Sequence, residues 1–100
     1  EMAFAGDLGA ELQISQMPVA TKSLSSVARL FSESNSRFLC EVPPEHAHPF
    51  ASQMADLPHA KIGKVVKDSH LTIREEPEGL ALIEASLANL KGSWKKPLAW

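Results

Sequence analysis

The chain has 100 residues, of which 44% are hydrophobic and 22% charged, and its formal net charge is −2. This composition predicts one small folded domain over residues 1–100 and argues against a nucleic-acid partner, which needs an excess of Lys and Arg. No apolar run is long enough to span a bilayer, and the first residues lack a signal-peptide pattern, so we expect no membrane partner and a cytoplasmic location. The single cysteine, Cys40, has no internal disulfide partner, which agrees with a reducing compartment.

The first half of the chain alternates predicted helices and strands. Residues 1–5 resemble the last turns of a helix, and Gly6 suits the left-handed position that follows. Apolar and polar residues alternate over 10–15, which predicts a half-buried strand. Helical spacing of apolar residues after the capping residue Ser23 predicts a helix over 24–32, and the apolar run over 37–42 predicts a central strand covered on both faces.

The second half adds more strands than helices. A second helix is predicted after Pro43 and Pro44, then two strands over 61–67 and 71–74 joined by a hairpin-like turn, and a short strand over 80–83. The last helix is expected to bury an apolar stripe made of Ile83, Leu87, Leu90 and Trp94. The order of elements predicts an α+β fold, with a mixed or mostly antiparallel sheet and helices packed on one face.

Pro49 conflicts with an unbroken helix from Pro44 to Ala55. Inside that helix it would remove one backbone hydrogen bond and crowd a carbonyl, at a cost of about 3 kcal/mol. It also pushes His48 away from helical backbone angles. We therefore predict a separate turn over 44–47 and a regular helix from about Pro49 to residue 55.

The most informative segment is the polar junction between the predicted helix and the central strand. It contains hydroxyl, amide, carboxylate and guanidinium groups without a glycine, and an ordinary turn needs fewer polar groups than this. Such a set can bind a phosphate, a ribose or another polar ligand. The alternative is that the hydroxyls and Asn35 satisfy the helix end while Glu33 and Arg37 form a solvated ion pair. The candidate cleft residues are Ser32, Glu33, Ser34, Asn35 and Arg37.

Other candidate sites are weaker. His46 and His48 near Cys40 suggest zinc, but residues two apart at the start of a helix point to different sides, so we expect no metal site. Cys40, within an apolar run, is expected to be a packed core thiol and no nucleophile. The lysines near Trp94 are the ordinary complement to the end of a helix dipole. We predict no catalytic residue in this chain.

Residues Leu30 to Val42, which read LFSESNSRFLCEV, resemble a helix-to-strand motif in the C-terminal half of phosphoribosylformylglycinamidine synthase, the synthetase subunit of that enzyme. Further similar pieces follow in the same order as in that family, and together they span nearly the whole chain. These pieces are AFAGDLGAEL at residues 3–12, PPEHA at 43–47, AKIGKV at 60–65 and the Trp94-Lys95 pair.

The resemblance implies a role in purine biosynthesis. In that family, ATP phosphorylates the amide oxygen of formylglycinamide ribonucleotide, and ammonia that a glutamine amidotransferase releases displaces the phosphate to give the amidine. The resemblance places this chain in the rear of the C-terminal domain of the second aminoimidazole-ribonucleotide-synthetase-like half. In that half the cleft is implied to hold a structural nucleotide. ATP and magnesium are expected as cofactors of the longer synthetase, with none bound to these 100 residues alone.

The same resemblance implies that a strand and most of a helix precede residue 1, so the domain is expected to be truncated at its N-terminus. We expect the exposed apolar surface to be covered by the remaining domains of the synthetase, or by a second copy of the chain in a homodimer. Two alternatives remain open. The first alternative is that the chain is a stand-alone α+β interaction or regulatory module. The second is that it is part of a related enzyme such as aminoimidazole ribonucleotide synthetase.

Overall fold

The structure is a computed structural model and describes residues 1–21, 23–33 and 35–98. The chain divides into two compact units, one made of Glu1–Gln16 with Ile62–Trp100 and the other of Met17–Lys61. The larger unit contains the whole sheet and is called the sheet unit below; Met17–Lys61 is called the loop unit. The prediction of one domain over residues 1–100 stays a prediction.

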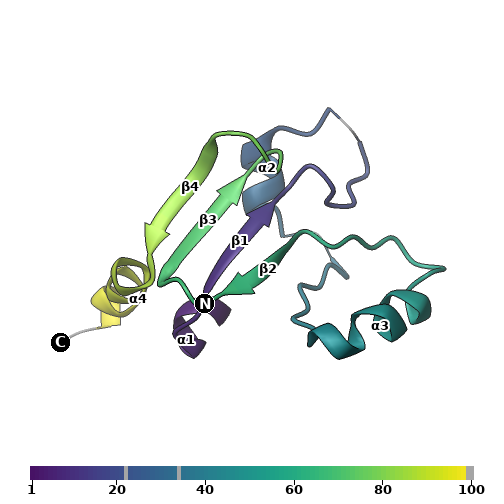
Figure 1. Cartoon of the computed structure of the whole chain (residues 1–100). Helices are drawn as coiled ribbons and strands as arrows, with labels where there is room; N and C mark the ends of the chain where they lie inside the picture. The colour runs from purple at the N-terminus through teal and green to yellow at the C-terminus, as the bar shows by residue number, and fades with distance from the viewer. Residues whose placement is uncertain (22, 34, 99–100) are drawn as a thin grey trace. The chain divides into compact units, whose positions relative to one another are not determined.

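The sheet unit confirms the predicted α+β class, because a four-stranded mixed sheet is combined with helices in this chain. Its strands lie in the order β2-β1-β3-β4, with β1 antiparallel to β2 and parallel to β3, and β3 antiparallel to β4 (Figure 1). The sheet unit has these elements: α1 (Met2–Gly6), β1 (Gly9–Gln13), β2 (Gly63–Val66), β3 (His70–Arg74), β4 (Ala81–Ser86), α4 (Leu87–Lys95) and the 3₁₀ helix η2 (Lys96–Leu98).

The predicted hairpin between the strands over 61–67 and 71–74 is wrong. Both strands form, but β1 lies between them and pairs with each (Figure 1). Two strands on either side of a third are about 10 Å apart, because neighbouring strands are about 4.8 Å apart. Residues 67–69 must cover that distance, and the four Cα steps from Val66 to His70 span at most about 14 Å. The connection is therefore short, and it passes directly across the start of β1.

Gly9 lies directly beneath this connection. A Cβ atom built on Gly9 would overlap the backbone carbonyl oxygens of Asp68 and His70. Gly9 is buried, and the backbone N–H of Leu87 donates to the carbonyl oxygen of Ser69 at 2.9 Å, which attaches the start of α4 to the same connection. The absence of a side chain at residue 9 is thus what permits the crossing.

Paired residues give the sheet one polar and one apolar face. Side chains alternate between faces along a strand, and directly paired residues share a face. On the polar face, Glu11 pairs with both Lys64 and Thr72, and Lys64 Nζ lies 3.7 Å from Glu11 Oε2. On the apolar face, Ile73 pairs with both Leu12 and Ile83. The apolar face is the one that forms the core of this unit.

The helices of the sheet unit meet through one aromatic contact. The rings of Phe4 in α1 and Trp94 in α4 have centroids 5.8 Å apart at an interplanar angle of 49°. The Ser86 hydroxyl caps α4 by accepting the Asn89 N–H at 3.2 Å, and Leu87 is buried. Ile83, which was predicted both to end the strand over 80–83 and to begin the apolar stripe of the last helix, lies in β4. The strand continues to Ser86, which pairs with His70, so the helix begins only at Leu87.

The left-handed residue after α1 is Asp7, with φ 54°, and Gly6 is the last helical residue, so the prediction for Gly6 is wrong by one position. Asp is among the few residues other than Gly that tolerate this conformation. Within the described residues, no helix is both long and apolar enough to cross a membrane.

The loop unit contains short helical elements and no strand among its described residues. They are α2 (Ser26–Phe31), the 3₁₀ helix η1 (Pro44–His46) and α3 (Ala47–Gln53). Residues 37–42 form neither helix nor strand, so the predicted central strand is wrong. Phe38 is 84% and Leu39 60% exposed, and Cys40 is exposed, which contradicts its prediction as a packed core thiol. A strand needs a neighbour for its backbone, and none pairs with this segment among the described residues.

The separate turn before α3 is confirmed, but α3 begins at Ala47, two residues earlier than predicted. Pro49 is the third residue of this helix. It lies in the first turn, where backbone N–H groups have no intrahelical acceptor, so the missing N–H costs little. The boundary between η1 and α3 lies at His46, whose backbone angles are φ −106° and ψ 0°. His48 is helical, so the expectation that Pro49 pushes it away from helical angles is wrong.

We expect Gly9→Ala to lower the free energy of unfolding by about 2 to 3 kcal/mol, because the new methyl group forces the 67–69 connection away from β1. Gly92→Ala in α4 is the matched control. A Cβ there meets nothing within 4 Å, and alanine favours a helix by roughly 0.5 to 1 kcal/mol, so this variant is expected to gain stability. Urea unfolding followed by circular dichroism measures both. Equal midpoints for Gly9→Ala and the unmodified chain would contradict the crossing.

Candidate functional site

The candidate site is the loop that follows α2, named here the Ser32–Arg37 loop. The N-terminus of α2 is capped by Ser25, whose hydroxyl oxygen accepts a hydrogen bond from the Ala28 N–H at 3.2 Å. The predicted cap Ser23 is therefore wrong by two residues. Three serines, at 23, 25 and 26, are all suitable caps, and local sequence does not choose between them.

At its other end α2 stops at Ser32, whose backbone is extended, with φ −70° and ψ 141°. The Ser32 N–H donates to the carbonyl oxygen of Ala28 at 2.9 Å, which completes the last turn of the helix. The hydroxyl group of Ser32 is therefore not needed to cap the helix and projects into the loop.

Arg37 closes the loop on this hydroxyl group. Its Nη1 donates to Ser32 Oγ at 2.7 Å across five residues of the chain. Among the described residues, Arg37 makes no ion pair with Glu33, so the alternative that these two side chains form a solvated pair is wrong. The guanidinium group has five N–H donors, and this contact uses one of them. No other hydrogen bond or ion pair of the Arg37 side chain is found among the described residues, so the remaining donors can serve an anionic or carbonyl ligand.

Ser36 bends the loop between Asn35 and Arg37. It adopts a left-handed conformation, with φ 62°, which costs a serine about 1 kcal/mol or more. Ser36 was not among the predicted site residues. The only signal in the sequence is the preceding Asn35, a residue type that is common in such turns.

The structure brings Ser32 and Arg37 into contact and places Glu33 and Asn35 on the same exposed loop. The predicted site residue Ser34 lies outside the described residues. Because every described side chain of the loop is exposed, the loop offers donors and acceptors to a ligand without excluding water from it. A small-molecule site normally buries most of its ligand. The Ser32–Arg37 loop is therefore one wall of a site at most.

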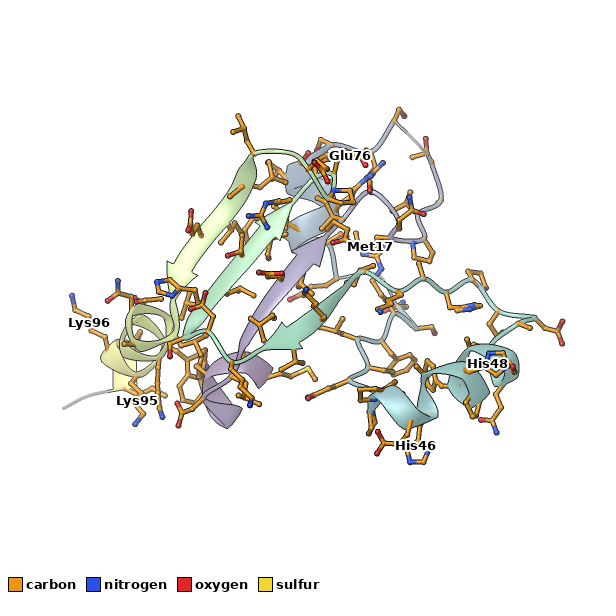
Figure 2. The ribbon with its side chains drawn as sticks, viewed as in Figure 1. Met17, His46, His48, Glu76, Lys95 and Lys96 are labelled. Atoms are coloured by element: carbon orange, nitrogen blue, oxygen red, sulfur yellow. The ribbon has the colours of Figure 1, made fainter. Side chains whose placement is uncertain are left out.

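The remaining candidates do not assemble into a site. Figure 2 shows His46 and His48 at separate places on the helical segment that begins with η1, and no group of metal-binding side chains is found among the described residues. His70 Nδ1 lies 2.9 Å from Asp68 Oδ1, on the exposed surface. Lys95 and Lys96 extend away from the end of α4 (Figure 2). Cationic groups at that position complement the helix dipole.

Three comparisons with known proteins bear on the family. The chain is similar to the curated protein "Phosphoribosylformylglycinamidine synthase subunit PurL" from three bacteria. It is 36% identical to the protein of Corynebacterium aurimucosum over 80 residues, which is 78% of this chain and 10% of that protein. It is 28% identical to that of Alkaliphilus metalliredigens over 100 residues and 32% identical to that of Deinococcus radiodurans over 98 residues. Each of these two matches covers 98% of this chain and 12% of the relative.

The chain thus spans about a tenth of the length of the curated relatives it matches. No solved structure matches it. The resemblance to phosphoribosylformylglycinamidine synthase, inferred from residues 30–42 and the pieces around them, is confirmed by these relatives. A family model described as "AIR synthase related protein, C-terminal domain" matches residues 1–76. The chain therefore belongs to the family of AIR synthase-related C-terminal domains.

Proposed function

We propose that this chain contributes to the reaction of a phosphoribosylformylglycinamidine synthase in purine biosynthesis. The observation that carries the proposal is that relatives with this name align with 78% to 98% of the chain. The reaction is an ATP-dependent carbon–nitrogen ligation. ATP phosphorylates the amide oxygen of formylglycinamide ribonucleotide, and ammonia then displaces the phosphate to form the amidine.

The proposed role of the Ser32–Arg37 loop is to line a nucleotide or substrate cleft. Hydroxyl and amide groups hydrogen-bond ribose or phosphate oxygens, and the Arg37 guanidinium supplies a positive charge. The contact between Arg37 and Ser32 supports this role, because it holds the cation at the loop before a ligand arrives. The proposed set is Ser32, Glu33, Ser34, Asn35 and Arg37, and none of them acts as a catalytic acid or base.

Other parts of the synthetase are proposed to complete the site. A magnesium ion bound with ATP needs oxygen ligands, usually carboxylates, and the described residues contain no group of side chains that fits this requirement. The other domains of the synthetase are therefore proposed to hold the magnesium and to close the exposed loop. A glutamine amidotransferase is the proposed source of ammonia, and the cytoplasm is the proposed location. These 100 residues are proposed to be inactive alone.

The second candidate is aminoimidazole ribonucleotide synthetase, and the observation that favours it is the description of the matching family model. A stand-alone interaction or regulatory module is the third. The substrate separates the first two, because phosphoribosylformylglycinamidine synthase consumes formylglycinamide ribonucleotide and needs ammonia. A stand-alone module would catalyse neither synthetase reaction.

The isolated chain is expected to bind ATP weakly or not at all. Its candidate loop is exposed, and ordering a mobile ligand on one open wall leaves little net affinity. Isothermal titration calorimetry with ATP and magnesium measures this. Tight binding at one ATP per chain would show that these residues form a complete site.

Within the complete synthetase that contains this chain, we expect Ser32→Ala and Arg37→Ala to raise the KM for ATP or formylglycinamide ribonucleotide by about tenfold. This is the size expected for one lost hydrogen bond to a charged group. Ser52→Ala, an exposed serine of α3, is the matched control and should leave KM unchanged.

The assay follows ATP-dependent formation of the amidine. Absence of that product from the unmodified synthetase would refute the proposed reaction. Normal KM values in both loop variants would refute only a role of the loop in binding a substrate.

A further inference from the structure

Residues 37–42 leave an apolar segment without a backbone partner. Phe38 is 84% and Leu39 60% exposed, and Cys40 is exposed. Among the described residues, no backbone hydrogen bond involves residues 38–42. An unpaired backbone beside large apolar side chains favours the addition of a strand from another chain.

The composition of the segment suits a strand. Phe38 and Val42 have high strand propensity, and the segment contains neither Gly nor Pro. With a period of two, Phe38, Cys40 and Val42 fall on one face, and Arg37, Leu39 and Glu41 fall on the other. One face is therefore entirely apolar, and the other has a cation and an anion on either side of a leucine.

The charges make the segment complementary to itself. If two copies pair antiparallel with Leu39 opposite Leu39, Arg37 of each copy lies opposite Glu41 of the other. Opposite charges at directly paired positions stabilise a sheet, and like charges destabilise it. The same register places Phe38 opposite Cys40 on the apolar face. Because the arrangement has twofold symmetry, it forms both charge pairs at once and is limited to two copies at these pairs.

Other registers lack these pairs. Centring on Cys40 places Leu39 opposite Glu41 and Arg37 opposite Pro43, which has no N–H to donate. Centring on Phe38 brings Ser36, with its left-handed backbone at φ 62°, into the paired strand. The register centred on Leu39 is the one that pairs both charged residues. Its directly paired part runs from Arg37 to Glu41, so it stops before both Ser36 and Pro43.

We propose that residues 37–42 form a self-association site, at which the segment pairs antiparallel with the same segment of a second copy of this chain, centred on Leu39. The paired ribbon gathers the apolar faces of both copies. Two strands alone are marginally stable, so further apolar surface must be buried with them. The loop unit offers it on α2, where Val27 and Phe31 are one helical turn apart and 67% and 69% exposed.

Sedimentation equilibrium of the full 100-residue chain, without nucleotide, tests the proposal. The unmodified chain is expected to form a dimer. Arg37→Glu and Glu41→Arg should each weaken dimerisation by about tenfold, because each replaces two attractive pairs by two repulsive ones. The double variant Arg37→Glu/Glu41→Arg should recover the original dissociation constant. Glu45→Arg, which changes an exposed charge of η1 outside the segment, is the control and should have no effect.

Cysteine cross-linking tests the register. The variant Leu39→Cys/Cys40→Ser should form a disulfide-linked dimer under mild oxidation, because directly opposite Cα atoms lie within the range that a disulfide spans. The unmodified chain should cross-link poorly, because Cys40 lies opposite Phe38. Strong cross-linking through Cys40 would instead overturn the register.

Three results would overturn the self-association site. They are a monomer at every concentration, a double charge variant that remains as weak as the single variants, and growth to large particles without a dimer. All of these readouts are molecular masses measured without ATP, so they are independent of the proposed synthetase function.

Discussion

The crossing of residues 67–69 over Gly9 is the constraint on which the sheet unit depends. A short connection has to carry the chain from one side of β1 to the other, and it passes so close that no side chain fits beneath it. The same connection accepts a hydrogen bond from Leu87 at the start of α4, so the end of the sheet and the last helix share one anchor. Phe4 and Trp94 then bring α1 and α4 together. The close approach at Gly9 is what allows β2 and β3 to lie on either side of β1 with so short a connection between them.

Burial in this chain is limited. Among the described residues, Ile14 and Leu87 are the buried hydrophobic side chains that form its core, at 4% and 5% exposure. The apolar face of the sheet is only partly covered, and several large apolar side chains of the loop unit, such as Phe31 and Phe38, are more than half exposed. A folded state with so little burial gains little hydrophobic free energy to offset its conformational entropy. The proposed self-association would cover part of this exposed apolar surface.

Arg37 takes part in both the proposed ligand cleft and the proposed self-association site. In the structure its guanidinium group holds the Ser32 hydroxyl, which orders the loop proposed to face a nucleotide or substrate. The same residue begins the segment proposed to pair with a second copy. A planar guanidinium group with several donors can serve a hydroxyl and a carboxylate together. The two proposals are therefore compatible at Arg37. Only the self-association proposal also depends on residues after Arg37, namely Leu39 and Glu41.

The sequence by itself determined the local elements. Alternation over residues 10–15 identified β1, and apolar spacing identified α2 and α4. Proline chemistry separated η1 from α3. The motif at 30–42 identified the family and the polar residues of the candidate loop. These features depend on neighbours within a few residues, and their signals are therefore visible in the chain itself.

Only the tertiary structure decided which strands pair and which side chains meet. Two strands joined by a short turn look like a hairpin until β1 is placed between them. Ile83 has helical spacing to Leu87 yet lies in β4, because Ile73 is its partner. Residues 37–42 have the composition of a central strand and remain unpaired among the described residues. Arg37 could reach either Glu33 or Ser32, and it donates to Ser32. The physical reason is the same in each case. The periodicity of a segment indicates which of its residues can be buried or paired, but the partner of that segment lies far away in the sequence and cannot be identified from local residues.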